Sequence, residues 1–322
     1  MRRSRRLAVL ALFAAVAAPL RAEEPGPRVR KWLESGAPDK CVDVVFVGDG
    51  YVRGQLTDGG KYWHDVERYA KRFLEEAPFA WYRGRTNVSA VFVESAEEGC
   101  GKDADAKPRT ALRSHFDTAA GRLLAFGDAP ALRAAVERAG EADIVFVMVN
   151  TERYGGAGTV LGDANVRGRP LPAPTFAAQD TTSFLIALHE LGHSFAGLAD
   201  EYADAKLVPQ WPLPKDGKDL AEANVTLEAF VDPKSKTWLR PDTKWAHFAA
   251  LAGGGGRRWA FEGGYYRDKG VFHPWSACRM ERNADPYCPV CCEEVAKAIH
   301  AATGEPWDDA AWHAAHPLSL WR

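Results

Sequence analysis

The sequence lacks the marks of several large classes of protein. Its 41 basic and 43 acidic residues nearly balance, and no long basic run follows residue 22, so a nucleic-acid or anionic-membrane partner is not expected. No segment after residue 22 reaches the roughly 20 apolar residues that a bilayer-spanning helix needs. The chain has no internal repeat and no low-complexity tail. Its 322 residues fit one large domain or two closely packed subdomains.

The first 22 residues, by contrast, have the layout of an export signal. Four arginines within the first six residues precede a short apolar run at residues 7–20, and residues 20–22 (LRA) offer a cleavage site. The alternative is an uncleaved membrane anchor, but the run is too short to span a bilayer comfortably. We therefore expect a mature, soluble chain that begins near Glu23, is secreted or periplasmic, and has no membrane partner. The sequence does not indicate an oligomeric state.

Short apolar segments alternate with segments of helical periodicity over much of the chain. The apolar, β-branched segments predict buried strands, and the others predict helices. The expected strands are residues 41–47, 86–93 and 143–149, and the expected helices are residues 61–77, 109–118, 129–139, a helix capped by residues 180–182 that runs to about Ala196, and residues 292–302. This alternation predicts an α/β fold with a mostly parallel sheet. Residues 203–275 show little periodicity and predict loops with short elements.

The helix that ends near Ala196 contains the sequence HELGH at residues 189–193. Positions four apart lie on one face of a helix, so His189 and His193 can converge on one metal ion. Glu190 lies about 100° around the helix and can reach a metal-bound water without being a ligand. The alternative is a chance match with both histidines satisfied in the core. The motif lies in an apolar, capped helix that follows a buried strand and a glycine-rich segment, which favours a zinc site.

Two histidines are not enough, because a catalytic zinc normally takes three protein ligands and a water. Gly197 lets the chain turn back towards the ion after the helix ends. In the metzincin pattern the third ligand is ten residues beyond the first histidine, and here that position is Ala199, which cannot bind. Asp200 follows, and a carboxylate is an accepted zinc ligand. We favour Asp200, with Glu201 as the alternative because its side chain has the longer reach.

These residues resemble the igalysin family, the IgA-specific metallo-endopeptidases. The most specific part of the resemblance is HELGHSFAGLADEY at residues 189–202. Shorter segments fall in the family's order along most of the expected mature chain: VVFVGDGY (44–51), APF (77–79), TNVSAVFVES (86–95), VNTERYGG (149–156), NVT (224–226), GGYY (263–266) and CRMERNADPYCPVC (278–291). The resemblance covers most of the chain beyond the export signal.

The resemblance implies an α/β (α+β) zincin-like metallopeptidase fold. An upper subdomain at residues 23–202 would carry a mixed sheet and the active-site helix, and a lower, irregular subdomain at residues 203–322 would close the cleft. Met280 takes the place of the methionine turn beneath the metal, where it packs without binding the ion. Residues 272–274 read FHP where the family often has an aromatic residue followed by Arg-Pro, so His273 is a departure in the expected substrate-binding wall.

The implied activity is that of a secreted zinc-dependent endopeptidase that acts on protein or peptide substrates. His189, His193 and Asp200 would bind one Zn²⁺, and Glu190 would act as the general base. Three tyrosines are candidate donors to the transition state, or else packing residues: Tyr202, Tyr265 and Tyr266. Two alternatives stay open, namely a non-catalytic binding module on a zincin scaffold and a zinc amidase that acts on cell-wall material.

The six cysteines need a separate explanation: they are Cys41, Cys100, Cys278, Cys288, Cys291 and Cys292. An even number in an exported protein predicts disulfides, which would staple the irregular lower subdomain. The alternative is a second, structural zinc site in the C-terminal cluster of four. We favour disulfides because the chain is expected to be exported, although the sequence does not choose among the 15 pairings that six cysteines allow.

Overall fold

The structure is a computed structural model that describes residues 29–117, 121–162, 170–215, 217–230, 234, 239–252 and 259–321. The expected export signal at residues 1–22 lies outside the described residues. Within these ranges no helix combines the length and hydropathy that a bilayer crossing requires.

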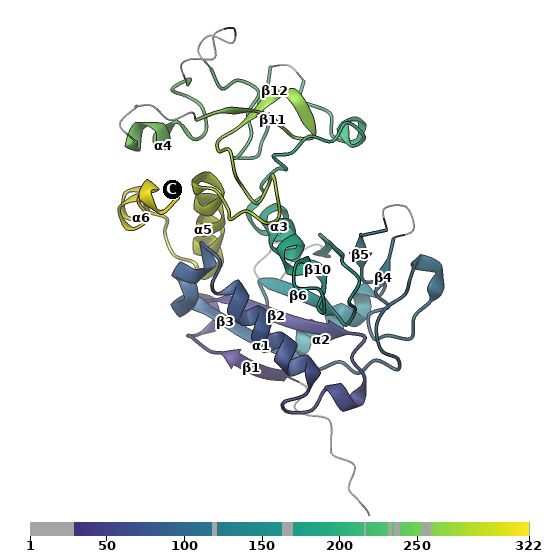
Figure 1. Ribbon diagram of the computed structural model, residues 1–322. Coiled ribbons are helices and arrows are strands. Elements are labelled where there is room, and N and C mark those ends of the chain that lie inside the picture. The colour runs from purple at the N-terminus through teal and green to yellow at the C-terminus, as the bar shows by residue number, and fades with distance from the viewer. Residues whose placement is uncertain are drawn as a thin grey trace, which may run out of the picture.

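A mixed six-stranded sheet forms the centre of the molecule, in the order β1-β3-β2-β6-β10-β7 (Figure 1). Its strands are β1 (Val29–Leu33), β2 (Val42–Asp49), β3 (Thr86–Val91), β6 (Ile144–Val149), β7 (Gly156–Ala157) and β10 (Thr175–Ala177). The four inner strands are parallel, whereas β1 and β7 run antiparallel to their neighbours and form the two edges. The predicted sheet is therefore confirmed as mostly parallel, and as mixed at its edges.

Both faces of the sheet are buried, which explains why its inner strands read as continuous apolar runs. Phe46 of β2 and Phe146 of β6 face a core shared with helices α1, α3 and α5. Val45 and Val145, one residue earlier in each strand, face a second core beneath α2. The helices are α1 (Lys61–Phe73), α2 (Ala129–Ala139), α3 (Ser183–Ala196) and α5 (Pro289–Thr303).

Beyond α3 the chain has little regular structure until α5, as its composition predicts. A hairpin of β11 (Phe261–Gly264) and β12 (Arg267–His273) lies on the side of α3 away from the sheet (Figure 1). Short elements complete the described part: β4 (His115–Phe116), β5 (Leu124–Ala125), β8 (Val160–Leu161), β9 (Leu171–Pro172), α4 (Ala246–Leu251) and α6 (Asp309–Ala315). The division of the chain at Tyr202 stays a prediction, and α5 from beyond it packs into the same core as α3.

Most of the predicted elements are confirmed within a few residues, but the helix expected at residues 109–118 is wrong. That segment is a loop ending in β4, and Arg113 within it has a left-handed φ of 53°. The cause is the buried carboxylate of Asp49, at the end of β2. It accepts hydrogen bonds from the backbone N–H groups of Leu112 (2.8 Å) and Ser114 (2.9 Å) and from the Thr110 hydroxyl (2.9 Å). A helix would need those N–H groups for its own bonds.

Candidate metal centre

Helix α3 and the turn after it determine where the predicted metal ligands lie. Asp180 stabilises the start of the helix from outside it. Its carboxylate accepts hydrogen bonds from the N–H groups of Thr182 (2.8 Å) and Ser183 (3.0 Å). Gly197 ends it with a φ of 64°, a left-handed conformation that glycine adopts without a Cβ penalty. The expected turn at Gly197 is therefore confirmed, and the chain after it returns Asp200 to the helix.

The structure brings His189, His193 and Asp200 together. The two Nε2 atoms are 3.1 Å apart, and the Asp200 Oδ1 atom lies 2.9 Å from Nε2 of His189 and 3.3 Å from Nε2 of His193. Ligand atoms around a tetrahedral zinc with bonds of about 2.1 Å are separated by about 3.4 Å. The spacing and the donor types of these three side chains therefore fit a zinc ion.

Both imidazole rings are held in the tautomer that a metal requires. The Nδ1 atom of His189 donates to the carbonyl oxygen of Arg279 (2.8 Å), and Nδ1 of His193 donates to the carbonyl oxygen of Leu198 (2.6 Å). Because a carbonyl oxygen can only accept, each Nδ1 carries the proton. Each Nε2 is then left with a lone pair that points to the shared centre, as in metal-binding histidines generally.

The electrostatics of the metal-free site follow from this crowding. Burial lowers the pKa of His193, but the hydrogen bond and the charge of Asp200 outweigh it and raise that pKa to about 9. Burial raises the pKa of Asp200, but hydrogen bonds from the two histidines hold it well below its ordinary value. Without a metal, the ionised Asp200 carboxylate therefore favours a proton on His193, at the position that a metal ion would take. A metal ion must displace that proton.

Glu201, the alternative third ligand, points away from the histidines. Its Oε1 atom accepts a hydrogen bond from the side-chain amide of Asn224 (2.9 Å) and from the Cys291 thiol (3.4 Å). Burial, followed by the nearby Cys278 sulfur, raises the pKa of Glu201 to about 8. Asn224 also binds both backbone groups of Ala199, and its sequence position gave no signal of this role. Of the two carboxylates, only that of Asp200 reaches the predicted metal position.

Met280 lies beneath α3, fully buried. Its sulfur is so close to Gly192 that a Cβ there would lie 2.6 Å from it. The Met280 carbonyl oxygen accepts a hydrogen bond from the backbone N–H of Glu201 (2.8 Å), so the same segment also fixes the chain next to Asp200. The position is the one expected for a methionine turn, and Gly192 permits the close approach.

The candidate tyrosines differ in what they contact. Tyr265 and Tyr266 form the tip of the β11–β12 hairpin, with left-handed φ values of 48° and 65° that are rare outside glycine and asparagine. The Tyr266 hydroxyl donates to Oδ2 of Asp200, whereas the Tyr265 ring packs edge-on against Trp211. Tyr202 makes ring contacts with His189 and Tyr266, and its hydroxyl has no hydrogen-bond partner among the described residues.

A cleft of about 580 Å³ opens over the three ligands. Residues 158–160, Trp211 and the two hairpin tyrosines line it together with the ligands. Glu190 lines the cleft beside the histidines, and Gly158 approaches its carboxylate so closely that a Cβ would lie 2.2 Å from Oε2. Sequence reasoning missed Gly158 and Trp211, because neither position carries a motif of its own.

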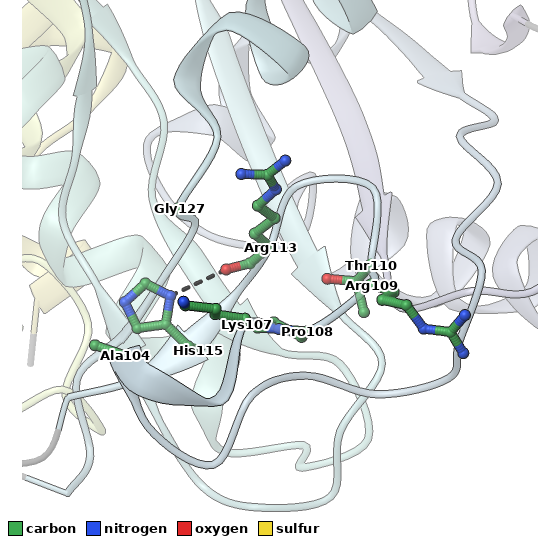
Figure 2. Close-up of a pocket in the computed structure, with 8 residues that line it drawn as sticks. All are labelled: Ala104, Lys107, Pro108, Arg109, Thr110, Arg113, His115 and Gly127. Atoms are coloured by element: carbon green, nitrogen blue, oxygen red, sulfur yellow. Dashed lines mark hydrogen bonds between the residues drawn. The ribbon is translucent and has the colours of Figure 1, made fainter.

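A second cavity, of about 640 Å³, shares no residue with this cleft. Figure 2 shows that its two arginine side chains point in different directions rather than towards one centre. Arg109 is paired with Glu97 (3.3 Å), and Arg113 with Asp128 (3.6 Å). None of the metal-ligand groups found in the described part of the chain lies there. The histidine cleft is therefore the better candidate for a metal-dependent site.

The predicted disulfides are absent. All six cysteines are thiols in the structure. The Sγ atoms of Cys278 and Cys291 are 3.6 Å apart, whereas a disulfide bond measures about 2.05 Å. Instead, the sulfurs of Cys278, Cys288 and Cys291 gather with a Glu201 carboxylate oxygen within 4.8 Å of one another. His273, the departure noted in the sequence, is buried beside the same carboxylate, with its Nδ1 atom 3.5 Å from Oε2.

Comparison of the sequence with models of known protein families finds a match. The sequence model of a family described as IgA Peptidase M64 matches residues 31–252. This range covers more than half of the chain and includes α3, Glu190 and the three converging ligands, whereas the β11–β12 hairpin and the cysteines at 278–292 lie beyond its end. No curated protein matches the sequence. Since the matched range carries both the sheet and the histidine helix, the chain belongs to the IgA peptidase M64 family.

Proposed function

We propose that this peptidase is an exported, zinc-dependent endopeptidase with a single catalytic ion. The observation that carries the proposal is the meeting of two Nε2 atoms and one carboxylate oxygen at the floor of an open cleft, with Glu190 beside them. The basic and apolar layout of residues 1–22 supports export. The position of the cleft, between the sheet-bearing part and the hairpin, supports a zincin-like division into upper and lower subdomains at Tyr202.

His189, His193 and Asp200 would hold the ion. A zinc ion bound there would lower the pKa of a water molecule to about 7 and polarise the scissile carbonyl group. The backbone carbonyls of Arg279 and Leu198 keep both imidazoles oriented throughout, because they hold the Nδ1 protons.

Glu190 is the proposed general base. Its carboxylate takes a proton from the attacking water and returns it to the leaving amine, so it must lie within hydrogen-bond reach of both. Gly158 supports this role, because the absence of a side chain there leaves room for the carboxylate to stay at the edge of the cleft. No neighbouring side chain is needed to hold the carboxylate.

The tyrosines have separable roles in this proposal. Tyr266 positions Asp200 by donating to the carboxylate oxygen that faces away from the histidines. Tyr202 has its hydroxyl available and lines the same cleft, so it is the proposed donor to the oxyanion of the tetrahedral intermediate. Burial, and then the charge of Asp200, raise the pKa of Tyr202, which keeps the hydroxyl protonated as a donor. Tyr265 belongs to the cleft wall.

The walls of the cleft indicate what the substrate presents. Val160 and Trp211 are each 44% exposed although both are large apolar side chains. Both line the cleft, so a peptide with apolar side chains beside the scissile bond would cover them.

The test is cleavage of a diverse quenched-fluorescent peptide library by the zinc-loaded protein, beside Glu190→Gln. The wild type is expected to cut internal bonds, and the variant to lose about 10²–10⁴-fold in kcat because the proton transfer is lost. Glu137→Gln, an exposed glutamate on α2, is the matched control and should keep full activity. Equal activity of wild type and Glu190→Gln would refute the general-base role.

An inactive wild type that is folded and holds zinc would refute general peptidase activity. The non-catalytic binding module and the amidase acting on cell-wall material would then be the remaining explanations. Digestion of isolated cell-wall material by the same preparation separates these two, because only the amidase releases new amino groups from it.

A further inference from the structure

Three cysteines and one glutamate form a second group of metal-ligand atoms, separate from the histidine cleft. The Sγ atoms of Cys278, Cys288 and Cys291 and a carboxylate oxygen of Glu201 all lie within 4.8 Å of one another. The Cys291 sulfur lies 3.4 Å from Oε1 of Glu201, and the Cys278 sulfur lies 3.6 Å from the Cys291 sulfur. Ligand atoms around a tetrahedral zinc with thiolate ligands are about 3.6–3.8 Å apart.

This group is sealed from solvent and is incompletely satisfied. Each of the four residues is at most 2% exposed. The second oxygen of Glu201, Oε2, makes no close hydrogen bond among the described residues, and its nearest charged partner is Nδ1 of His273 at the long distance of 3.5 Å. A buried carboxylate oxygen without a donor costs a folded protein free energy, and native structures rarely leave such a group unexplained.

We propose that Cys278, Cys288, Cys291 and Glu201 bind a structural Zn²⁺ ion, distinct from the ion of the histidine cleft. The chemistry fits this metal, because thiolates are preferred zinc ligands and a set of four protein ligands without an open position is the mark of a structural site. On binding, the three thiols and the Glu201 carboxyl group release their protons to solvent, and the ion takes their place. This inference goes beyond the proposed peptidase function and does not depend on it.

The local structure supports the ligand arrangement. Cys288 is the residue before the first turn of α5, and Cys291 lies within that turn, so the CPVC sequence places two sulfurs at the start of a 15-residue helix. The positive end of a helix stabilises thiolate charge. The Asn224 amide and the His273 imidazole face the Glu201 carboxylate and can offset the remaining negative charge.

The proposed ion would stabilise the backbone segments that orient the ligands of the histidine cleft. Glu201 is the neighbour of Asp200 in the chain, and Cys278 is the neighbour of Arg279, whose carbonyl oxygen accepts the Nδ1 proton of His189. The backbone N–H of Glu201 donates to Met280. An ion that ties Glu201 to Cys278 therefore fixes the two segments that orient the cleft ligands.

Metal analysis of the purified, reduced protein tests the inference. Wild-type chains are expected to hold two equivalents of zinc, and His193→Ala chains one. The double variant Cys288→Ser/Cys291→Ser is also expected to hold one, retained in the cleft. Cys292→Ser is the matched control: this buried thiol is next in sequence but contacts the carbonyl oxygen of Tyr287 instead, so two equivalents should remain. Peptidase activity is not the readout, and the difference of one equivalent between the wild type and the cysteine double variant is expected whether or not the cleft holds an ion.

A second measurement covers the case in which the double variant does not fold. Wild-type and His193→Ala proteins are produced in cobalt-supplemented medium, and both should show the near-ultraviolet absorption of a thiolate bound to Co²⁺. A reduced wild-type protein with one equivalent of metal and no thiolate band would overturn the inference. So would peptide mapping under non-reducing conditions that finds Cys278, Cys288 or Cys291 in a disulfide.

Discussion

Asp200 and Glu201 are consecutive acidic residues whose side chains serve two different groups of ligands. Asp200 joins two imidazoles at the floor of an open cleft, where the His193 side chain is 28% exposed. Glu201 joins three sulfurs in a closed interior. The two groups differ in donor chemistry as well as access: nitrogen and oxygen ligands line an open cleft, whereas the sulfur ligands are fully enclosed.

The comparison shows how two neighbouring residues can belong to an open, reactive site and to a closed, structural one. A catalytic metal needs an open position for water and substrate, whereas a structural metal needs a closed set of ligands. After Gly197 the two consecutive carboxylates contact different partners, because Asp200 meets His189 whereas Glu201 meets Asn224 and Cys291. One peptide unit is therefore shared by the two groups, and changes to its two side chains should have opposite consequences.

The largest effect is expected from separate alanine substitutions of these two carboxylates. Asp200→Ala should reduce kcat/KM by more than about 10²-fold. Loss of a residue that only orients a metal ligand costs up to about 10²-fold, and loss of a ligand itself should cost more. The Asp200→Ala protein should keep one equivalent of metal at the cysteines. Glu201→Ala should show the reverse, with the cysteine-bound metal weakened and a lower Tm. Metal analysis and calorimetry of the two proteins check this. If both variants lost the same ion, the histidine group and the cysteine group would not be separate metal sites.

Gly158→Ala should disturb the histidine cleft and leave the cysteine group unchanged. The new methyl group collides with the Glu190 carboxylate, which must move aside. A displacement near 1 Å costs about 10²-fold in rate, so kcat should fall by that order while the content of both metals stays unchanged. Gly54→Ala, where a Cβ would meet nothing within 4 Å, is the control. Unchanged kcat in Gly158→Ala would show that Glu190 acts from another position.

Tyr266→Phe is expected to weaken the open group more mildly. The variant removes the hydrogen bond to Oδ2 of Asp200, and loss of such an outer partner typically lowers metal affinity about 10–100-fold. Competition with a chromophoric chelator measures this affinity, and the cysteine-bound equivalent should be unaffected. Tyr265→Phe has the same chemistry at the neighbouring position and should leave the affinity unchanged. Equal losses in both variants would point to the hairpin as a whole.

The smallest effect concerns a third group of ligand-type side chains, His247, Glu293 and His313. Glu293 already accepts from Lys297 (2.5 Å) and His247 (3.0 Å), so it is an ion pair and not a metal site. Burial raises the pKa of Glu293, but these partners outweigh it and lower that pKa below 4.5.

The unfolded chain therefore binds the Glu293 proton first as the pH falls. The free energy of unfolding includes this contribution above the ordinary pKa of 4.5 and loses it as the pH drops towards the folded value. The slope stays under about 1.4 kcal/mol per pH unit, the limit for one proton. Urea unfolding across the acid range should show a flatter pH dependence in Glu293→Gln than in the wild type or Glu137→Gln. Equal slopes in all three would contradict the assignment.

Sequence periodicity predicted the sheet because the inner strands are buried on both faces and α2 is a regular amphipathic helix. It failed at residues 109–118, where the competing hydrogen-bond acceptor is Asp49, some 60 residues away in the chain. The β11–β12 hairpin also escaped prediction, because its turn is formed by two tyrosines in left-handed conformations and not by asparagine and glycine.

The candidate site was predictable where spacing alone determines geometry. The two histidines share a helix face, so their convergence followed from the sequence. The choice between Asp200 and Glu201 did not, because it depends on Tyr266 on one side and on Asn224 and Cys291 on the other. The disulfide prediction failed for the same reason: composition counts cysteines, whereas pairing depends on a carboxylate that the fold places among them.

The burial of the three sulfurs determines when a metal ion can bind to them, relative to the histidine cleft. An ion cannot reach or leave a fully enclosed set of ligands without local unfolding, so its exchange is limited by how often the surrounding segments open. The histidine cleft has no such barrier and can exchange its ion with the surroundings. The cysteines would therefore bind their metal most readily while the chain is still folding. A chain that closes without it would take up zinc supplied later only as fast as these segments open, whereas its cleft would fill at once.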